Sequence, residues 1–160
     1  MLFWLDEAVL AEQQEEAAHL MSLVAVDAST QGKYAEAEPL YQRALRIWEQ
    51  SLGPDHPDVA HPLNNLAILY QEQGKYAEAE PLFQRALRIR EQSLGPDHPD
   101  VAYPLNGLAI LYREQGKYAK AEPLYQRALR IREQSLGPDH QLTQETRNNY
   151  ANLLRAMGSR

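Results

Sequence analysis

The sequence predicts an all-α fold, a solenoid of repeated helical units in place of one globular core. The first observation is a sequence repeat. The sequence of residues 32–73 recurs at 74–115 and begins again at Gly116, with a period of 42 residues. The second is that apolar residues within each unit recur at helical spacing. The third is a Gly-Pro pair in each unit, which divides it into two helical segments. A period of this length is typical of solenoids, whose units bury apolar surface only by stacking on their neighbours.

The two complete units are nearly identical. They differ at five positions only: Tyr41/Phe83, Trp48/Arg90, His61/Tyr103, Asn65/Gly107 and Gln71/Arg113. Because the units are otherwise identical, these differences indicate which surfaces differ in function between the units.

Residues 1–160 are predicted to form a single array of about seven helices. Residues 5–31 have good helix formers and neither proline nor glycine, so they are expected to form a diverged first helix. Units follow at 32–73, 74–115 and 116–140, the last of them partial. Residues 141–156 are expected to form a capping helix, because Arg147 stands where the preceding unit has Leu105 and suits a solvated face.

Within a unit, residues 34–51 are predicted to form one helix, with Pro39 close to its start, where a missing backbone donor costs little. Gly53 and Pro54 end that helix. Asp55 or Asp58 is expected to cap the next helix, which runs to about Gln73.

The second helical segment of the unit carries its core residues at positions i, i+3, i+4 and i+7, namely Leu63, Leu66, Ala67 and Tyr70. Pro62 and Pro104 would lie inside this segment if it started at residue 55 or 56. We therefore expect a kink at these prolines or a late helix start near residue 58.

Composition excludes several classes of function. Charged residues make up 24% of the chain and the net charge is −6, so binding to nucleic acid phosphates is not expected. The chain has no cysteine, which excludes disulfides, thiolate metal sites and thiol catalysis and is compatible with a reducing cytoplasm. The apolar opening MLFWLDEAVL lacks the basic region of a signal peptide and the length of a membrane span. We expect a cytoplasmic protein that does not engage membranes, and the sequence is compatible with a part of a longer protein.

Catalytic and metal-binding motifs are not found in the sequence. It has no serine-histidine-acid arrangement, no phosphate-binding loop and no HExxH motif, so we expect no enzyme activity and no cofactor. His56, His98 and His140 recur near aspartates, but their spacing equals the repeat, which places each in a different linker. Turn and cap chemistry explains them better than a metal site does.

The repeats resemble tetratricopeptide repeats of the extended kind found in kinesin light chains and in many bacterial proteins. The resemblance spans nearly the whole chain and rests on four runs: LNNLAILY at 63–70, QGKYAEAEPL at 73–82, RALRIRE at 85–91 and LGPDHPDVA at 94–102. It implies antiparallel helix pairs wound into a right-handed superhelix. It also implies that the first helix of each pair lines a concave groove that holds peptides.

The same face is predicted without the family, because His61 and Asn65 vary and lie opposite the core residues of their helix. Asparagine rows can hold an extended peptide backbone. The predicted peptide-binding residues are His61, Asn64, Asn65, Ile68, Gln71, Glu72, Tyr103, Asn106, Ile110, Arg113, Glu114, Asn148 and Asn152. His61, Tyr103 and Arg113 are expected to give specificity. The alternatives are neutral drift of exposed positions and local hydrogen bonding by the asparagines.

The groove departs from the patterns of two known groups of tetratricopeptide domains. Kinesin light chains resemble it in their asparagines but use basic residues to hold acidic peptides that contain tryptophan, whereas this sequence has Glu72 and Glu114 on the face and Gly107 in place of an asparagine. Arg113 and Arg147 are the basic residues expected there. Domains that clamp chaperone carboxylates need polar groups where Ile68 and Ile110 stand.

Aromatic residues near the first unit support a second hypothesis, in which the chain is a structural self-assembly element. Trp48 replaces an arginine of the other units, and Phe3, Trp4 and Leu5 lie in the apolar opening. These four residues are predicted either to cover the N-terminal end of the array or to join two copies as a homodimer or longer stack.

Overall fold

The computed structural model describes residues 2–158 and the side chains of residues 9–158, and its regular structure is helical throughout that part. The α-helices are α1 (Leu2–Thr30), α2 (Tyr34–Leu52), α3 (Ala60–Glu72), α4 (Tyr76–Leu94), α5 (Ala102–Glu114), α6 (Tyr118–Leu136) and α7 (Gln141–Gly158). Short 3-10 turns at Pro57–Val59 and Pro99–Val101 precede α3 and α5. The predicted all-α solenoid of seven helices is confirmed for these residues.

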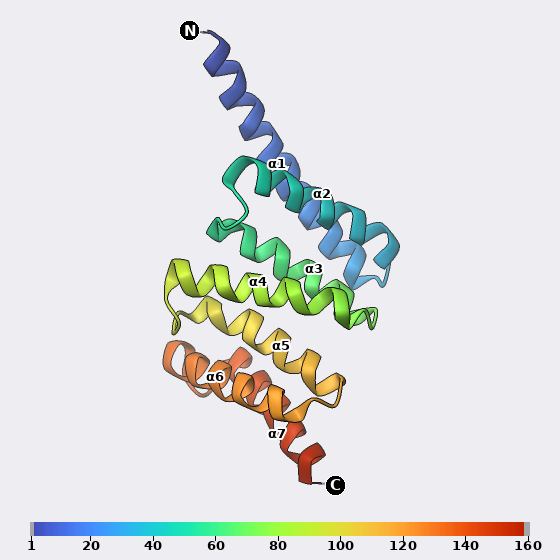
Figure 1. The fold of residues 1–160 in the computed structure, drawn as a ribbon, viewed down its shortest axis with the longest axis vertical. Helices are drawn as coiled ribbons and strands as arrows, with labels where there is room; N and C mark the ends of the chain where they lie inside the picture. Colours follow the sequence, from blue (N-terminus) through green and yellow to red (C-terminus); the bar gives the residue numbers. More distant parts are fainter. Residues whose placement is uncertain (1, 159–160) are drawn as a thin grey trace.

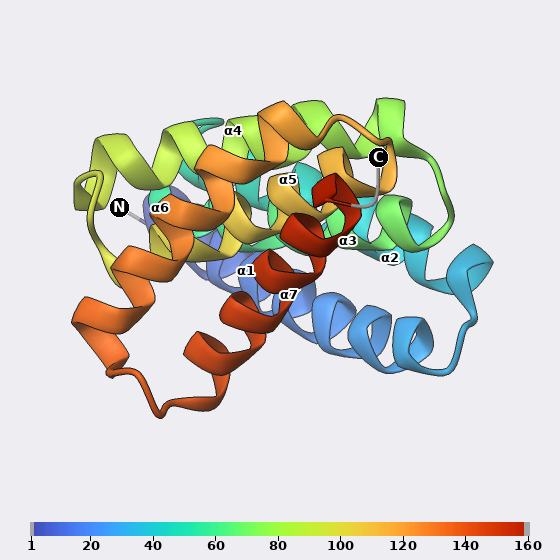
Figure 2. The ribbon, with the colours of Figure 1, turned by 90° about the horizontal axis from the view of Figure 1, so that it is seen from below.

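The helices pack in sequential pairs, α1 with α2, α3 with α4 and α5 with α6, while α7 packs against α6. Figure 1 shows the pairs stacked along the long axis, with the N-terminal part of α1 extending beyond the rest of the array. Seen from below, α1, α3, α5 and α7 lie toward one side and α4 and α6 toward the other (Figure 2). We call α1, α3, α5 and α7 the first helices and the side they form the inner face.

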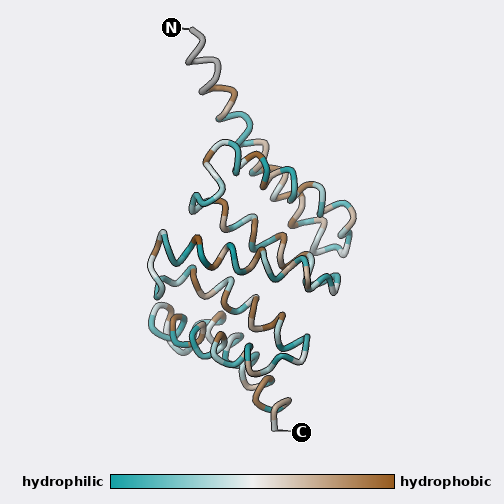
Figure 3. The backbone as a smooth tube through the Cα atoms, viewed as in Figure 1, coloured by the Kyte–Doolittle hydropathy of each residue, from teal (hydrophilic) through white to brown (hydrophobic). Residues whose placement is uncertain are grey.

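The core runs along the whole stack. Small residues such as Ala37, Ala67 and Ala79 are fully buried, which lets neighbouring helices approach closely. The predicted core residues Leu63, Leu66 and Ala67 are buried, and Tyr70 is half-buried. Figure 3 shows apolar segments distributed over the stacked helices instead of gathered in one centre, as expected when each pair buries its surface against the next.

The linkers end one helix and cap the next. Gly53 has φ of 94°, a left-handed conformation that favours glycine, and its N–H donates to the Glu49 carbonyl. The cap of the next segment is His56, whose Nδ1 accepts from the Asp58 N–H at 3.2 Å, and His98 repeats this contact. The prediction of an aspartate cap was therefore wrong, because the imidazole nitrogen reaches the same amide.

The prolines are accommodated in different ways. The segment Pro57–Val59 forms a 3-10 turn and α3 begins at Ala60, which leaves Pro62 in the first turn, where backbone donors have no intrahelical partner. Helix α3 thus starts late, which was one of the two expectations from the sequence, and it begins slightly later than the expected residue 58. Pro39 lies further into its helix than expected. Because α2 begins at Tyr34, the proline lies inside the helix, on an exposed side.

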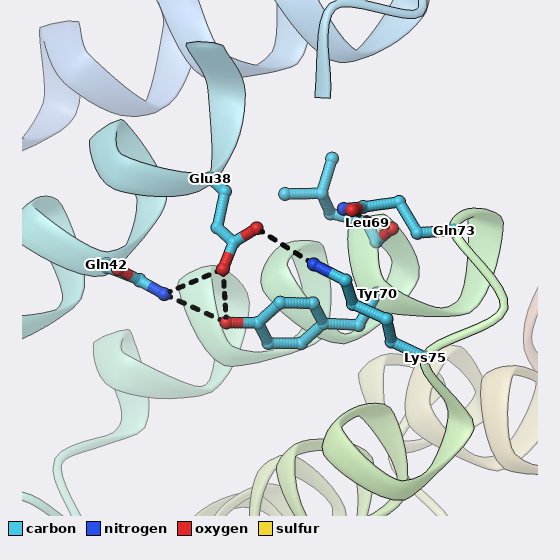
Figure 4. A network of polar contacts seen from close by, with 6 residues as sticks. All are labelled: Glu38, Gln42, Leu69, Tyr70, Gln73 and Lys75. Atoms are coloured by element: carbon cyan, nitrogen blue, oxygen red, sulfur yellow. Dashed lines mark hydrogen bonds and ion pairs between the residues drawn. The ribbon is translucent and has the colours of Figure 1, made fainter. Parts of the chain in front are cut away.

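A polar network joins the second helix of each pair to the first helix of the next pair. The Tyr70 hydroxyl donates to Glu38 Oε1 at 3.1 Å and accepts from Gln42 Nε2 at 2.9 Å, while Lys75 Nζ lies 3.3 Å from Glu38 Oε2 (Figure 4). The next unit repeats the tyrosine contact, with the Tyr112 hydroxyl 2.7 Å from Glu80.

The capping helix α7 keeps this network with a tyrosine from one turn earlier. Leu154 stands at the position of Tyr112, and the hydroxyl of Tyr150 donates to Glu122 Oε1 at 3.3 Å. The Tyr150 ring also stacks on Tyr125, with ring centroids 6.2 Å apart. The contact is therefore conserved in space although the tyrosine has moved in sequence.

Two of the five variable positions form a packing pair. Gly107 of α5 is buried, and a Cβ atom there would overlap the ring of Phe83 in α4, with Cζ only 2.7 Å away. The equivalent pair in the first unit is Tyr41 with Asn65. The difference between Gly107 and Asn65 is therefore tied to Phe83.

We predict that Gly107→Asn, which installs the residue of the preceding unit, lowers the free energy of unfolding by about 1–3 kcal/mol because it overpacks the core against Phe83. Adding Phe83→Tyr recreates the pair seen at Tyr41 and Asn65 and should recover part of the loss. Urea denaturation followed by circular dichroism measures both. Unchanged stability of the single variant would contradict the packing assignment.

Candidate binding groove

Two equivalent pockets open on the inner face, one repeat apart. The pocket between α1 and α3 has a volume of about 190 Å³, and that between α3 and α5 about 310 Å³. Ile68 and Glu72 line both of them, which makes the two pockets parts of one groove along the first helices. We call the larger one the α3–α5 pocket; its walls are Asn64, Ile68, Gln71, Glu72, Tyr103, Asn106, Gly107, Ile110, Glu114 and Arg132.

The two pockets differ at one variable position of their lining. Asn65 lines the smaller pocket, whereas Gly107 lines the larger one. The space that a side chain at residue 107 would enter is filled by the ring of Phe83, so the exchange removes one amide from the pocket wall.

Two asparagines that line the α3–α5 pocket have a buried amide oxygen without a donor. Asn64 is 7% exposed, and its Oδ1 has no hydrogen-bond partner among the described residues; the Oδ1 of Asn106 is buried and unpartnered as well. Buried acceptors left without donors are costly and uncommon in folded proteins. The two residues therefore carry unused hydrogen-bonding capacity beside the pocket. Local hydrogen bonding, the alternative for these residues, does not satisfy either oxygen.

Tyr103 stands at one end of the α3–α5 pocket between two guanidinium groups. The Cζ atoms of Arg90 and Arg132 lie 5.8 and 5.3 Å from the centre of its ring, within the range of cation–π attraction. Both arginines are buried, and this burial lowers the pKa of each guanidinium from its usual value. Tyr103 remains 42% exposed while its ring lies within reach of both guanidinium groups.

The same two arginines are anchored to the backbone. Nη1 of Arg90 donates to the Asp100 carbonyl at 3.0 Å, and Nη1 of Arg132 donates to the Leu142 carbonyl at 3.1 Å. In the first unit Trp48 takes this position, half-buried against the core. The variable positions 48/90 and 61/103 are thus neighbours in space as well.

A wider groove, of about 860 Å³, continues the inner face toward the N-terminus. Trp48, His61 and Arg90 line it together with Glu16 and Leu20 of α1. The side chains of Phe3, Trp4 and Leu5 lie outside those that the structure describes, so their part in self-association stays a prediction. Trp48 contributes to this groove and to the core at once.

The remaining predicted residues lie at different places. Gln71 lines the α3–α5 pocket and donates to Glu114 Oε2 at 3.3 Å. Arg113 is half-buried beside the pocket and does not line it. Arg147 bonds to Glu133 of α6 at 2.9 Å instead of presenting its charge to the groove.

Asn148 and Asn152 are exposed on α7, beyond the two pockets. The sequence did not indicate Arg132 as a pocket residue. Arg132 comes from a second helix, which the helical-wheel argument did not consider; the repeated difference between Trp48 and the two arginines was the signal that could have found it.

These features define the protein as an α-solenoid with a groove along its inner face. The chain belongs to the tetratricopeptide repeat family, whose model matches residues 15–92, 62–134 and 105–159. Its repeats are of the kinesin light chain-like type, as the sequence resemblance indicated. Proteins of this family generally mediate protein–protein interactions and are typically non-catalytic scaffolds.

Solved structures with the same fold support this assignment. BtubC (BKLC) from P. vanneervenii is similar with a TM-score of 0.80 and 26% identity, over 88% of this chain and 56% of that chain. A putative kinesin light chain from Podosopora anserina with nearly identical TPR-like repeats has a TM-score of 0.73 and 23% identity, over 89% and 68% of the two chains. The TPR domain of Arabidopsis OM64 has a TM-score of 0.65 and 15% identity, over 89% and 98%. A comparison with curated proteins finds no match.

Two further properties hold for the part of the chain that the structure describes. None of its helices combines the length and the apolar character that crossing a membrane requires. Among the same residues, histidines and carboxylates do not come together in a group of three or more that could hold a metal ion.

We predict that His61 titrates below its usual range. Desolvation in the groove lowers the pKa of its imidazole, and the charge of Arg90 lowers it further, against an opposing effect of Asp100. Arg90→Met should therefore raise this pKa, as followed by imidazole proton shifts in NMR between pH 4 and 8. A pKa that stays constant or falls in the variant would contradict the placement of Arg90 against His61.

Proposed function

We propose that the protein is an interaction scaffold that captures an extended segment of a partner protein in the groove on its inner face. The observation that carries this proposal is that two asparagines, Asn64 and Asn106, line the α3–α5 pocket and have amide oxygens without a donor among the described residues. Backbone N–H groups of an extended segment provide donors at regular intervals, and side-chain amides can bind them without reading sequence.

The groove offers separate places for backbone and side chains. In this proposal Asn64 and Asn106 hold the backbone, while Ile68 and Ile110 give apolar walls on either side of the pocket. His61 and Tyr103 occupy equivalent positions one repeat apart and present different rings, so they read different side chains of the partner. Arg113 lies next to the pocket and contributes positive charge, although it does not line the pocket. Asn148 and Asn152 extend the polar row onto α7 for a longer segment.

We predict that Asn64→Ala together with Asn106→Ala weakens binding of a partner segment at least about tenfold and leaves folding nearly unchanged. Neither oxygen has a partner among the residues that the structure describes, so its removal breaks no acceptor bond there. The measurement is a peptide-display selection against the parent chain, followed by fluorescence anisotropy of enriched peptides on the parent and the variant.

The matched control is Gln50→Ala together with Gln92→Ala, which removes two exposed amides one repeat apart on α2 and α4. This variant should bind like the parent, and thermal melting should show that all three proteins are folded. Equal affinity of the asparagine variant and the parent would exclude the groove as the binding site.

Self-association is a second candidate function, favoured by an uncovered apolar face of α1. Leu20, Leu23 and Val24 are 62%, 54% and 56% exposed, and Val9 and Leu10 continue the apolar surface. In the repeat register, Val24 corresponds to Leu66 of α3, which is buried at 4% exposure. Exposed apolar clusters of this kind commonly mark interfaces, and a second copy could cover this one.

We predict for this candidate that the mass of the parent chain in light scattering rises from monomer toward dimer with concentration, and that Leu23→Glu with Val24→Glu keeps it monomeric. Charges on the face would be buried without partners in a dimer, which is costly. A parent chain that is monomeric at every concentration would remove self-association as a function.

A further inference from the structure

Helix α1 differs from the other first helices in its length. It runs without a break from Leu2 to Thr30, over 29 residues, whereas α3 and α5 have 13 residues each and α7 has 18. Its N-terminal part extends beyond the array of paired helices (Figure 1). Val9 and Leu10, which belong to this part, are exposed. The extension therefore presents apolar side chains to solvent.

The extension corresponds in sequence to the end of a second helix. With the 42-residue period, residues 2–10 align with residues 44–52, which form the C-terminal half of α2. Four aligned positions agree in residue type: Phe3 with Leu45, Leu5 with Ile47, Glu7 with Glu49 and Leu10 with Leu52. The side chains of residues 2–8 lie outside those that the structure describes, so this correspondence is one of sequence. Helix α1 thus joins the end of a second helix to the first helix that follows it.

The linker that separates two such helices elsewhere is replaced in α1 by helix-forming residues. In the first unit, residues 53–58 have the sequence GPDHPD, and Gly53, with φ of 94°, ends α2 there. The equivalent residues 11–16 are AEQQEE, which include neither glycine nor proline and favour helix. Because α1 continues through them, residues 2–10 do not fold back on the rest of α1 as α2 folds back on α3.

The C-terminal part of α1 leaves open the surface on which a preceding second helix would pack. In α3 the equivalent surface includes Leu63 and Leu66, which share a buried core cluster with Leu45 of α2. The matching residues of α1 are Met21 and Val24, and Val24 is 56% exposed where Leu66 is 4% exposed. Each copy thus has a site for a second helix and a segment of that kind, which its straight helix keeps apart.

We propose that two copies of the chain exchange these parts, so that residues 2–10 of each copy pack as a second helix on α1 of the other. The inference rests on the self-association proposed above, since it names the part of the second copy that covers the open face of α1. The two α1 helices then lie antiparallel, like consecutive helices within the array, and a two-fold axis relates the copies.

The contact continues an interface that the array already uses. In the first unit, Leu45 near the end of α2 shares a core cluster with Val59 and Leu63 at the start of the next first helix. The proposed dimer places residues of the same register at the same point, supplied by the other copy. Because the exchange is reciprocal, the interface forms twice and removes Leu10 and Leu20 of both copies from solvent. A second copy always carries the matching segment, which favours it over an unrelated partner.

The charge of α1 determines how this dimer responds to salt. Helix α1 has acidic residues such as Glu12, Glu15 and Glu16 and contains no lysine or arginine. Two such helices side by side repel each other, and added salt screens the repulsion. The dissociation constant of the dimer should therefore fall as the salt concentration rises. A dimer that weakens with added salt would contradict the arrangement.

The test first locates the contact with single cysteines, which the chain otherwise lacks. An antiparallel overlap of residues 2–22 brings the middle of this stretch next to its equivalent in the other copy. Gln13 is exposed near that middle and lies at helical spacing from Leu20 and Val24. Gln13→Cys should therefore give a disulfide-linked dimer on oxidation, whereas Thr30→Cys, at the exposed far end of α1, should not.

A second variant restores the linker. Replacing residues 11–16 by GPDHPD, the chain's own sequence of residues 53–58, allows residues 2–10 to fold back on α1 of the same copy. In light scattering this variant should dimerise at least about tenfold more weakly than the parent. Glu12→Gln is the matched control, because it has the same net charge as the linker variant and keeps the helix. It should dimerise at least as tightly as the parent, and thermal melting should show that all variants are folded.

The outcomes distinguish the exchange from self-association in general. If the parent chain dimerises but the linker variant dimerises equally well, or Gln13→Cys gives no linked dimer, the exchange is overturned and self-association stands. A parent chain that is monomeric at every concentration would overturn both.

Discussion

Every feature of this molecule depends on the way each helix pair buries its apolar face against the next pair. The alanines of the stacking surface are fully buried, so helices of adjacent repeats approach closely and the polar network of Tyr70, Glu38 and Gln42 can bridge them. Because this packing is the same in each unit, it places the first helices side by side at constant register. The groove on the inner face is a consequence of that register, and so is the repetition of its pockets one unit apart.

Within this constraint, the few differences between units act in pairs. Phe83 fills the space beside Gly107, and Tyr103 stands between Arg90 and Arg132 where the first unit has His61 near Trp48. Four of the five variable positions are thus linked through contacts, which free drift of isolated surface positions does not explain. Their joint effect is to give two equivalent pockets different linings.

The sequence predicted the fold well because its signals are local and repeated. Helical spacing, the Gly-Pro linkers and the 42-residue period each depend on near neighbours, and they gave seven helices with their approximate limits. Predictions failed where a contact crosses between elements. The His56 side chain takes the cap expected of an aspartate, Arg147 pairs with Glu133, and Gly107 is buried by a ring of the preceding helix. The pocket was predicted in part, since one helical wheel places Asn64 and Ile68 but cannot place Arg132, which comes from another helix.

The central claim is that a partner segment lies in the α3–α5 pocket and forms hydrogen bonds with the side chains of Asn64 and Asn106, which line it. NMR spectra of the labelled chain, titrated with a peptide enriched by display, test it most directly through the side-chain amides of Asn64 and Asn106 and the methyl groups of Ile68 and Ile110. The account predicts that these signals shift together and saturate at one equivalent of peptide. Shifts confined to the uncovered face of α1 or to the outer sides of α4 and α6, with these four residues unchanged, would contradict it.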